Sequence, residues 1–180
     1  MGPDSTIGVD LGGQSVKLAV VDGQGSIRVR RQVAIDATDT AGRLAEQIVG
    51  QIDQIIAEAG EIGLAPRAVG LVMPGYMDRQ RTRLIFAANL PKLGGTSFLA
   101  DLKTAMSLPV TFDADCNAAA LAEARFGAGR GVGRLIVVAV GTGIGGGVVV
   151  DGEILRIREH IAGSLGHVIV NAKGPRCKCG

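Results

Sequence analysis

Residues 8–22 read GVDLGGQSVKLAVVD, and this stretch decides the fold class. Two mostly apolar runs, residues 6–11 and 16–21, flank the glycine pair Gly12 and Gly13. Apolar runs of this length separated by glycines are typical of two strands joined by a tight turn. The sequence therefore predicts an antiparallel strand pair near the start of the chain.

The segments that follow extend this pair into a sheet covered by helices. DGQG at residues 22–25 marks a second turn, and residues 26–35 alternate as a third antiparallel strand does. Apolar residues then recur at three- and four-residue spacing across residues 41–59, which predicts an amphipathic helix over the sheet. The further elements that we expect are strands at residues 68–73 and 110–112 and helices at residues 98–106 and 117–125.

The last third of the chain repeats the opening pattern. Apolar runs at residues 135–140 and 147–150 flank the glycine-rich run 141–147, as the first two strands flank their glycine pair. We therefore predict an α/β protein with a domain boundary near Asp113, without a linker. In this prediction residues 1–113 form a small N-terminal domain and residues 114–180 begin a larger C-terminal domain.

The composition excludes several classes of function. The 180 residues carry 19 Lys plus Arg against 17 Asp plus Glu, a net charge of +2 that is too small for bulk binding to nucleic acid or an anionic membrane. No apolar run approaches the ~18 residues of a membrane-spanning helix, and no signal peptide is recognisable, so we expect a cytoplasmic protein. The spacing of Cys177 and Cys179 suits a metal better than a disulfide framework.

The two glycine turns are candidate phosphate sites. Because glycine has no Cβ, the amides of Gly12 and Gly13, and those of residues 141–147, can approach an anion closely. Hairpin glycines are also commonly structural, so both interpretations stay open for each turn taken alone. The spacing in residues 141–147 matches the dinucleotide fingerprint, but an expected strand follows where that motif requires a helix, which rejects a Rossmann site.

Two carboxylates lie where an expected strand passes into an expected helix. Asp113 and Asp115 follow the strand at residues 110–112 and precede the helix at residues 117–125. Asp commonly caps a helix N-terminus, so a structural role is one interpretation. The other is a general base that accepts a proton from a substrate hydroxyl. Spacing alone leaves the two interpretations open.

Four motifs together resemble the ROK family (repressor, open reading frame, kinase). They are GVDLGGQSVKLAVVD at residues 8–22, DADCNAAALAEARFGAG at 113–129, VGTGIGGGVVV at 140–150 and AGSLGHVIVNAKGPRCKCG at 162–180. The resemblance implies the actin-like ATPase (ribonuclease H-like) fold, with two domains around a cleft. It also implies an ATP-dependent kinase for a hexose or amino sugar that uses Mg²⁺ with ATP and forms a homo-oligomer when complete.

The resemblance also assigns roles to single residues. It implies that Asp115 is the catalytic base and a sugar contact, and that Asp10 lies near the Mg²⁺. The further sugar-binding residues that it implies are Gly75, Asn89, Ser164 and His167, and the zinc ligands are His167, Cys177 and Cys179. The nucleotide phosphate-binding residues that it implies are Asp10, Gly12, Gly13, Gln14, Lys17, Gly141, Thr142, Gly143, Gly145 and Gly146.

Three positions depart from the family pattern. Gln14 stands where the family usually has Thr, Ala114 where it usually has Asn, and Ser164 where it usually has Glu. The last two contact sugar hydroxyls in the family. Each hydrogen bond lost inside a closed site costs ~1–3 kcal/mol, so we expect a substrate other than plain glucose.

A fourth departure is the position of Gly180, which falls inside the zinc motif before a third Cys ligand. The resemblance therefore implies the N-terminal portion of a kinase, inactive by itself, with an incomplete zinc site. The alternative is a non-catalytic sugar-sensing protein of the same fold. Only nine residues precede Asp10, which disfavours the helix-turn-helix domain of the family's repressors.

Overall fold

A computed structural model provides the structure of the chain. It divides into two compact units, Met1–Ala114 and Asp115–Gly180. The structure describes residues 4–36, 38–87, 89–141, 143–157 and 160–177.

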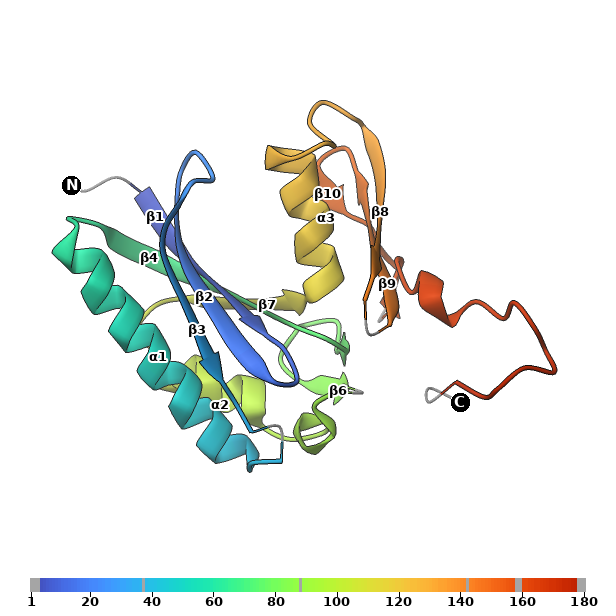
Figure 1. The fold of residues 1–180 in the computed structure, drawn as a ribbon, viewed down its shortest axis with the longest axis horizontal. Helices are drawn as coiled ribbons and strands as arrows, with labels where there is room; N and C mark the ends of the chain where they lie inside the picture. The colour runs from blue at the N-terminus through green and yellow to red at the C-terminus, as the bar shows by residue number, and fades with distance from the viewer. Residues whose placement is uncertain (1–3, 37, 88, 142, 158–159, 178–180) are drawn as a thin grey trace. The chain divides into compact units, whose positions relative to one another are not determined.

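The first unit is built on one mixed sheet with the order β3-β2-β1-β4-β7 (Figure 1). β1 pairs antiparallel with β2, and β2 with β3, which confirms the predicted three-stranded meander. β1 also pairs in parallel with β4, and β4 with β7. The strands span Asp4–Leu11 (β1), Ser15–Asp22 (β2), Ile27–Ala34 (β3), Ala65–Met73 (β4) and Val110–Ala114 (β7).

Two helices pack against this sheet and against each other. α1 spans Ala41–Glu61 and contacts β2, β3 and β4, and α2 spans Phe98–Ala105. α1 begins after Thr40, whose hydroxyl accepts a hydrogen bond from the Arg43 amide at 3.3 Å and so satisfies one of the open donors of the first turn. No helix in the described part of the chain is long and apolar enough to cross a membrane.

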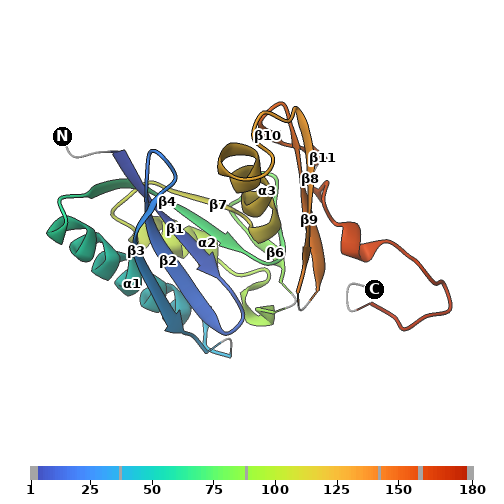
Figure 2. The same cartoon turned by 45° about the horizontal axis from the view of Figure 1, so that its top comes forward.

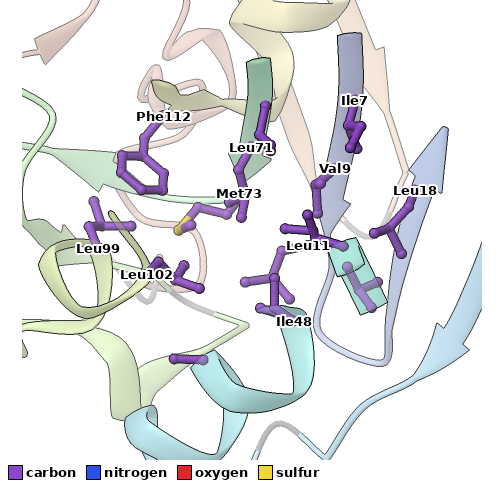
Figure 3. Close-up of a cluster of buried hydrophobic side chains, with 14 of the residues drawn as sticks. Ile7, Val9, Leu11, Leu18, Ile48, Leu71, Met73, Leu99, Leu102 and Phe112 are labelled. Carbon is purple, nitrogen blue, oxygen red and sulfur yellow. The ribbon is translucent and has the colours of Figure 1, made fainter. Parts of the chain in front are cut away.

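The core lies between the helices and the sheet. Alternate residues of β1 point into it, so that Ile7, Val9 and Leu11 are buried while their neighbours Thr6 and Gly8 are exposed. Figure 3 shows these side chains facing the apolar side chains of the helices and of the adjacent strands. The labelled partners are Leu18 of β2, Ile48 of α1, Leu71 and Met73 of β4, Leu99 and Leu102 of α2, and Phe112 of β7.

Replacing Ile48 by Ala is expected to lower the free energy of unfolding by about 2–5 kcal/mol. Ile48 is fully buried between α1 and the sheet, so the substitution removes apolar contacts and leaves a cavity. Urea unfolding measures the change. Ile62→Ala is the matched control, because Ile62 is the C-cap residue of the same helix and is 53% exposed. An equal loss in both variants would contradict this packing.

A short hairpin that the sequence analysis did not anticipate follows β4. β5 (Tyr76–Met77) pairs with β6 (Leu84–Phe86), and a 3-10 turn, η1 (Pro91–Leu93), comes next. Asp78 organises the hairpin loop, because its carboxylate accepts hydrogen bonds from the Thr82 hydroxyl at 2.7 Å and from the Thr82 amide at 2.6 Å. Burial raises the pKa of the Asp78 carboxyl, but these bonds and one from the Arg83 amide outweigh it, so the pKa lies below its ordinary value.

The second unit consists of helix α3 (Asp115–Phe126) and a three-stranded sheet, with short elements after it. The sheet has the order β10-β9-β8, with β8 antiparallel to β9, and Figure 2 shows α3 alongside these strands. α3 begins at Asp115, two residues before the predicted start. The remaining elements are β8 (Arg134–Val140), β9 (Ile144–Val150), β10 (Glu153–Ile154), β11 (Arg156–Ile157), β12 (His160–Ile161) and the 3-10 turn η2 (Leu165–His167).

The second glycine turn is shorter than predicted. The sequence predicted a turn over residues 141–147, but β9 begins at Ile144 and its glycines pair with β8. Gly145, Gly146 and Gly147 are therefore strand residues. Glycine weakens a strand interior and is found there mainly where another backbone approaches closely. Such close approaches occur on both faces of β9.

Candidate active site

The first glycine turn joins β1 to β2 and lies against the loop that carries Asn89. The Gly12 amide donates to the Ser15 carbonyl at 3.0 Å, so this amide already has an acceptor within the turn. A Cβ atom on Gly13 would lie 3.2 Å from both the Cβ and the carbonyl oxygen of Asn89, which leaves little room for a side chain. The structure thus brings together Gly13 and Asn89, a predicted phosphate-binding residue and a predicted sugar-binding residue. The backbone of Gln14 is also fixed, because its carbonyl accepts from the Ile35 amide at 3.0 Å.

Asp10 and Lys17 face each other across the same hairpin. They are cross-strand partners in the β1–β2 ladder, and Lys17 Nζ lies 3.4 Å from Asp10 Oδ2. The Asp10 side chain is 47% exposed and the Lys17 side chain 59%, so their ion pair contributes only about 0–1 kcal/mol to stability. Both charges can therefore be redirected to a ligand at little cost.

Gly75 is required by the backbone where β4 passes into β5. Its φ of 125° lies in the region that favours glycine, and a Cβ atom there would lie 2.1 Å from the Phe86 carbonyl oxygen. The structure therefore gives Gly75 a conformational role. Its predicted contact with a sugar stays a prediction.

The two carboxylates that the sequence left ambiguous have different surroundings. Asp113 is in β7, where its Oδ1 accepts from the Ala114 amide at 2.8 Å and its Oδ2 lies 3.4 Å from a guanidinium nitrogen of Arg81. Asp115 is the first residue of α3, and its Oδ1 accepts from the Cys116 amide at 2.7 Å. Asp115 thus lies at the N-terminal, positive end of the helix dipole.

The Cys116 thiol keeps its proton at neutral pH. Burial, together with the negative charge of Asp115, raises the pKa of the Cys116 thiol to about 11. The thiol is therefore neutral under physiological conditions, whereas a reactive cysteine needs a thiolate.

The second glycine turn is confined to residues 141–143. The Gly141 amide donates to the Gly143 carbonyl at 2.9 Å and closes the turn, and nothing lies within 4 Å of a Cβ atom built on Gly141 or Gly143. The turn is therefore open on the side where these Cβ atoms would point. Thr142, a predicted phosphate-binding residue, lies outside the described residues.

Gly145 and Gly147 lie under helix α3. A Cβ atom on Gly145 would lie 2.5 Å from the Cys116 Sγ, and one on Gly147 would lie 2.5 Å from the Cys116 carbonyl oxygen and 2.6 Å from the Ala120 Cβ. Real Cβ atoms essentially never come this close to other heavy atoms. The first turns of α3 therefore pack onto the backbone of β9, and this contact explains two glycines that the sequence analysis had assigned to the turn.

The other face of β9 carries the segment with Ser164 and His167. A Cβ atom on Gly146 would lie 3.0 Å from the Gly163 carbonyl oxygen, and one on Gly163 would lie 2.0 Å from the Gly146 carbonyl oxygen. Because strand residues alternate between faces, Gly146 faces away from α3. The glycines of β9 thus separate the helix that begins with Asp115 from the segment that carries Ser164 and His167.

Two of the three predicted zinc ligands lie close together. His167 Nδ1 is 3.7 Å from Cys177 Sγ, and both residues are exposed. Tetrahedral zinc with ordinary bond lengths separates a nitrogen and a sulfur ligand by ~3.6 Å, so this pair fits one zinc ion. Cys179 lies outside the described residues, and within the described part of the chain no three His, Cys, Asp or Glu side chains form a metal-binding group.

Comparisons with known proteins find sugar kinases among the similar proteins. A glucokinase of Thermotoga maritima is 36% identical over 174 residues, which cover 97% of this chain and 53% of the glucokinase. An N-acetylmannosamine kinase of Salmonella paratyphi B is 31% identical over 179 residues, which cover 98% of this chain and 58% of that kinase. The chain therefore spans little more than half the length of these curated relatives.

A solved structure of a related protein has the same fold. The crystal structure of a ROK family glucokinase from Streptomyces griseus in complex with glucose and AMPPNP superimposes with a TM-score of 0.81 and 38% sequence identity, over 98% of this chain and 54% of that one. This similarity confirms the predicted α/β, actin-like ATPase fold. The model of the ROK family matches residues 6–180, and the chain belongs to the ROK family.

Proposed function

We propose that the chain is part of a sugar kinase that transfers the γ-phosphoryl group of ATP to a hydroxyl of a hexose or amino sugar. The observation that carries this proposal is the position of Asp115 at the start of α3, packed on the strand that leaves the 141–143 turn. This gives one unit both a candidate base and a candidate phosphate-binding turn. The related kinases supply the choice of a sugar as acceptor.

In the proposed reaction, the sugar hydroxyl oxygen attacks the γ-phosphorus while its proton passes to the Asp115 carboxylate. The bond between the γ-phosphorus and the bridging oxygen breaks, and ADP leaves with that oxygen. Phosphoryl transfer depends on positioning and charge stabilisation more than on covalent chemistry. The 141–143 turn and the backbone around Gly13 and Gln14 would supply amides to the phosphates, with Lys17 as a cation nearby. Mg²⁺, held near Asp10 with ATP, would neutralise charge on the phosphate oxygens.

The acceptor is proposed at the level of a sugar class. The relatives include kinases for glucose and for N-acetylmannosamine. Ala114 and Ser164 lack the amide and carboxylate that the family commonly uses at these positions, so we propose weaker binding of plain glucose. A coupled assay of the whole protein with ATP or polyphosphate, against a panel of hexoses and amino sugars, tests both the kinase activity and the weaker binding of plain glucose. The absence of phosphorylation with every sugar and donor would reject the kinase and favour a non-catalytic sugar sensor, which has no need of a base.

Residues 1–180 alone are expected to bind nucleotide weakly and to show no ATP-dependent phosphorylation. The chain covers 53% of the length of the related glucokinase, and we expect the remaining length of a complete kinase to help enclose the nucleotide. An open site cannot exclude water from the transferring phosphoryl group. The same coupled assay, run on the purified chain beside the whole protein, measures this. Robust turnover by the chain alone would overturn the expectation.

Zinc is proposed as a structural metal of the whole protein, held in part by His167 and Cys177. Such a site needs four ligands and lends folding energy when it is complete. The 180-residue chain is therefore expected to lose zinc on dialysis against a mild chelator, and Cys177→Ser is expected to weaken binding further. Metal analysis after dialysis tests this. One tightly held zinc per chain would mean that a further ligand exists.

The remaining parts of the proposal concern location and assembly. ATP and a phosphorylated sugar are cytoplasmic metabolites, so we propose a cytoplasmic protein whose partners are these small molecules and not nucleic acid or membrane. A homo-oligomer stays a prediction for the whole protein. Light scattering of the whole protein tests it.

A further inference from the structure

We propose that Gly145 and Gly147 are positioning residues that set the location of Asp115, and that they do not act by contacting the nucleotide phosphates. This inference rests on the proposed function and deepens it. The two glycines allow α3 to lie directly on the backbone of β9. The position of α3, and of the Asp115 carboxylate at its first residue, therefore depends on the absence of a Cβ atom at these two positions.

The contact is made by the residue that follows Asp115. Cys116 touches both glycines, since its Sγ would lie 2.5 Å from a Cβ on Gly145 and its carbonyl oxygen 2.5 Å from a Cβ on Gly147. The Cys116 amide also donates to Asp115 Oδ1 at 2.7 Å. Any shift of Cys116 away from β9 therefore moves both the backbone of Asp115 and the donor that orients its carboxylate.

The same strand carries the turn toward which Asp115 must be directed. Gly145 follows Ile144, the first residue of β9, and the 141–143 turn comes directly before that residue. The distance between the candidate base and the candidate phosphate-binding turn is thus fixed through two contacts of Cys116. Gly146 completes the arrangement on the opposite face, where its close approach to Gly163 locates the segment with Ser164 and His167.

The experiment compares Gly145→Ala with Gly145→Ala/Cys116→Ala in the whole protein. A methyl group on Gly145 meets mainly the Cys116 Sγ, with the Cys116 Cβ at 3.8 Å, so removing the sulfur makes room for it. We expect Gly145→Ala to lower kcat at least about tenfold, because displacement of a catalytic group by ~1 Å can cost up to ~10²-fold. The double variant is expected to recover the kcat of Cys116→Ala. The KM for ATP is expected to stay within about threefold throughout, as for a group that acts on the chemical step.

Gly147→Ala provides a contrast within the same contact. Its methyl group would meet the Cys116 carbonyl oxygen and the Ala120 Cβ, neither of which Cys116→Ala removes. The kcat lost in Gly147→Ala is therefore expected to remain lost in Gly147→Ala/Cys116→Ala. Gly70→Ala in β4 is the control for a strand glycine, since nothing lies within 4 Å of a Cβ there, and its kcat is expected to be unchanged.

Three outcomes would overturn the inference. A rise in the KM for ATP in Gly145→Ala that Cys116→Ala does not reverse would identify Gly145 as a phosphate contact. Equal recovery of kcat in the Gly145 and Gly147 variants when Cys116→Ala is added would contradict the geometry, and so would an unchanged kcat in Gly145→Ala.

If Gly145→Ala does not fold, Cys116→Val applies the displacement from the helix side and is expected to lower kcat with the KM for ATP unchanged. Failure of the proposed function is distinct, because the wild-type protein would then phosphorylate no sugar.

Discussion

Replacing Asp115 by Asn is expected to lower kcat of the whole protein by about 10²–10⁴-fold, with the KM for the sugar nearly unchanged. An amide has the shape of the carboxylate and can still bind a sugar hydroxyl, but it cannot accept the proton that the hydroxyl loses. The substitution should leave the fold intact, because Asp115 is partly exposed and its Oδ1 accepts a local hydrogen bond from the amide of the next residue, Cys116. Steady-state kinetics with the preferred sugar measure the change.

Asp113→Asn is the matched control for this variant. Asp113 is two residues earlier and also partly exposed, but it belongs to the first unit, where it lies 3.4 Å from the guanidinium of Arg81. An ion pair of this kind contributes about 0–1 kcal/mol, so its loss is expected to change kcat less than about fivefold. If Asp115→Asn keeps more than about a tenth of the wild-type kcat, Asp115 is not the general base and its role is structural.

The strands and helices of the first unit follow from local patterns. In β1, apolar residues alternate with polar or small ones, and in α1 they recur so that Leu44, Ile48 and Ile52 share one buried face. Such periodicity reports which side of an element is buried. Together with apolar runs that end at glycine or proline, it predicted the main elements of this unit to within a few residues. The hairpin of β5 and β6 was missed because its strands have two and three residues, too few to carry a period.

The glycines of β9 could not be assigned from the sequence. Locally, Gly145 and Gly147 look like the turn glycines Gly141 and Gly143, since glycine permits both a turn and a close approach. The strand glycines differ from the turn glycines because Cys116 packs against them. Cys116 lies in α3, about 30 residues earlier in the sequence, so this contact exists only in the folded chain. For the same reason, the contact between Gly13 and Asn89 is a finding of the structure.

Replacing Asp10 by Asn is expected to lower kcat/KM for ATP by about 10²–10³-fold, corresponding to a loss of several kcal/mol of charge stabilisation in the transition state. Asp10 is next to the first glycine turn, and its carboxylate is the group that we propose to hold Mg²⁺ with ATP. The loss should not come from unfolding, because the ion pair of Asp10 with Lys17 is half exposed and contributes about 0–1 kcal/mol. Urea unfolding of the variant checks this point beside the kinetics.

Asp4→Asn separates the proposed metal contact from a general effect of removing a charge from β1. Asp4 begins the same strand and is ion-paired with Arg67 at 2.9 Å, but it lies at the end of β1 away from the glycine turn. Its loss is expected to leave kcat/KM within about twofold of wild type, since an exposed pair contributes little. Raising the Mg²⁺ concentration should partly restore Asp10→Asn and leave Asp4→Asn unaffected, because only a carboxylate that holds the metal changes the apparent metal affinity. Equal activity of the two variants at every Mg²⁺ concentration would show that Asp10 does not hold the metal.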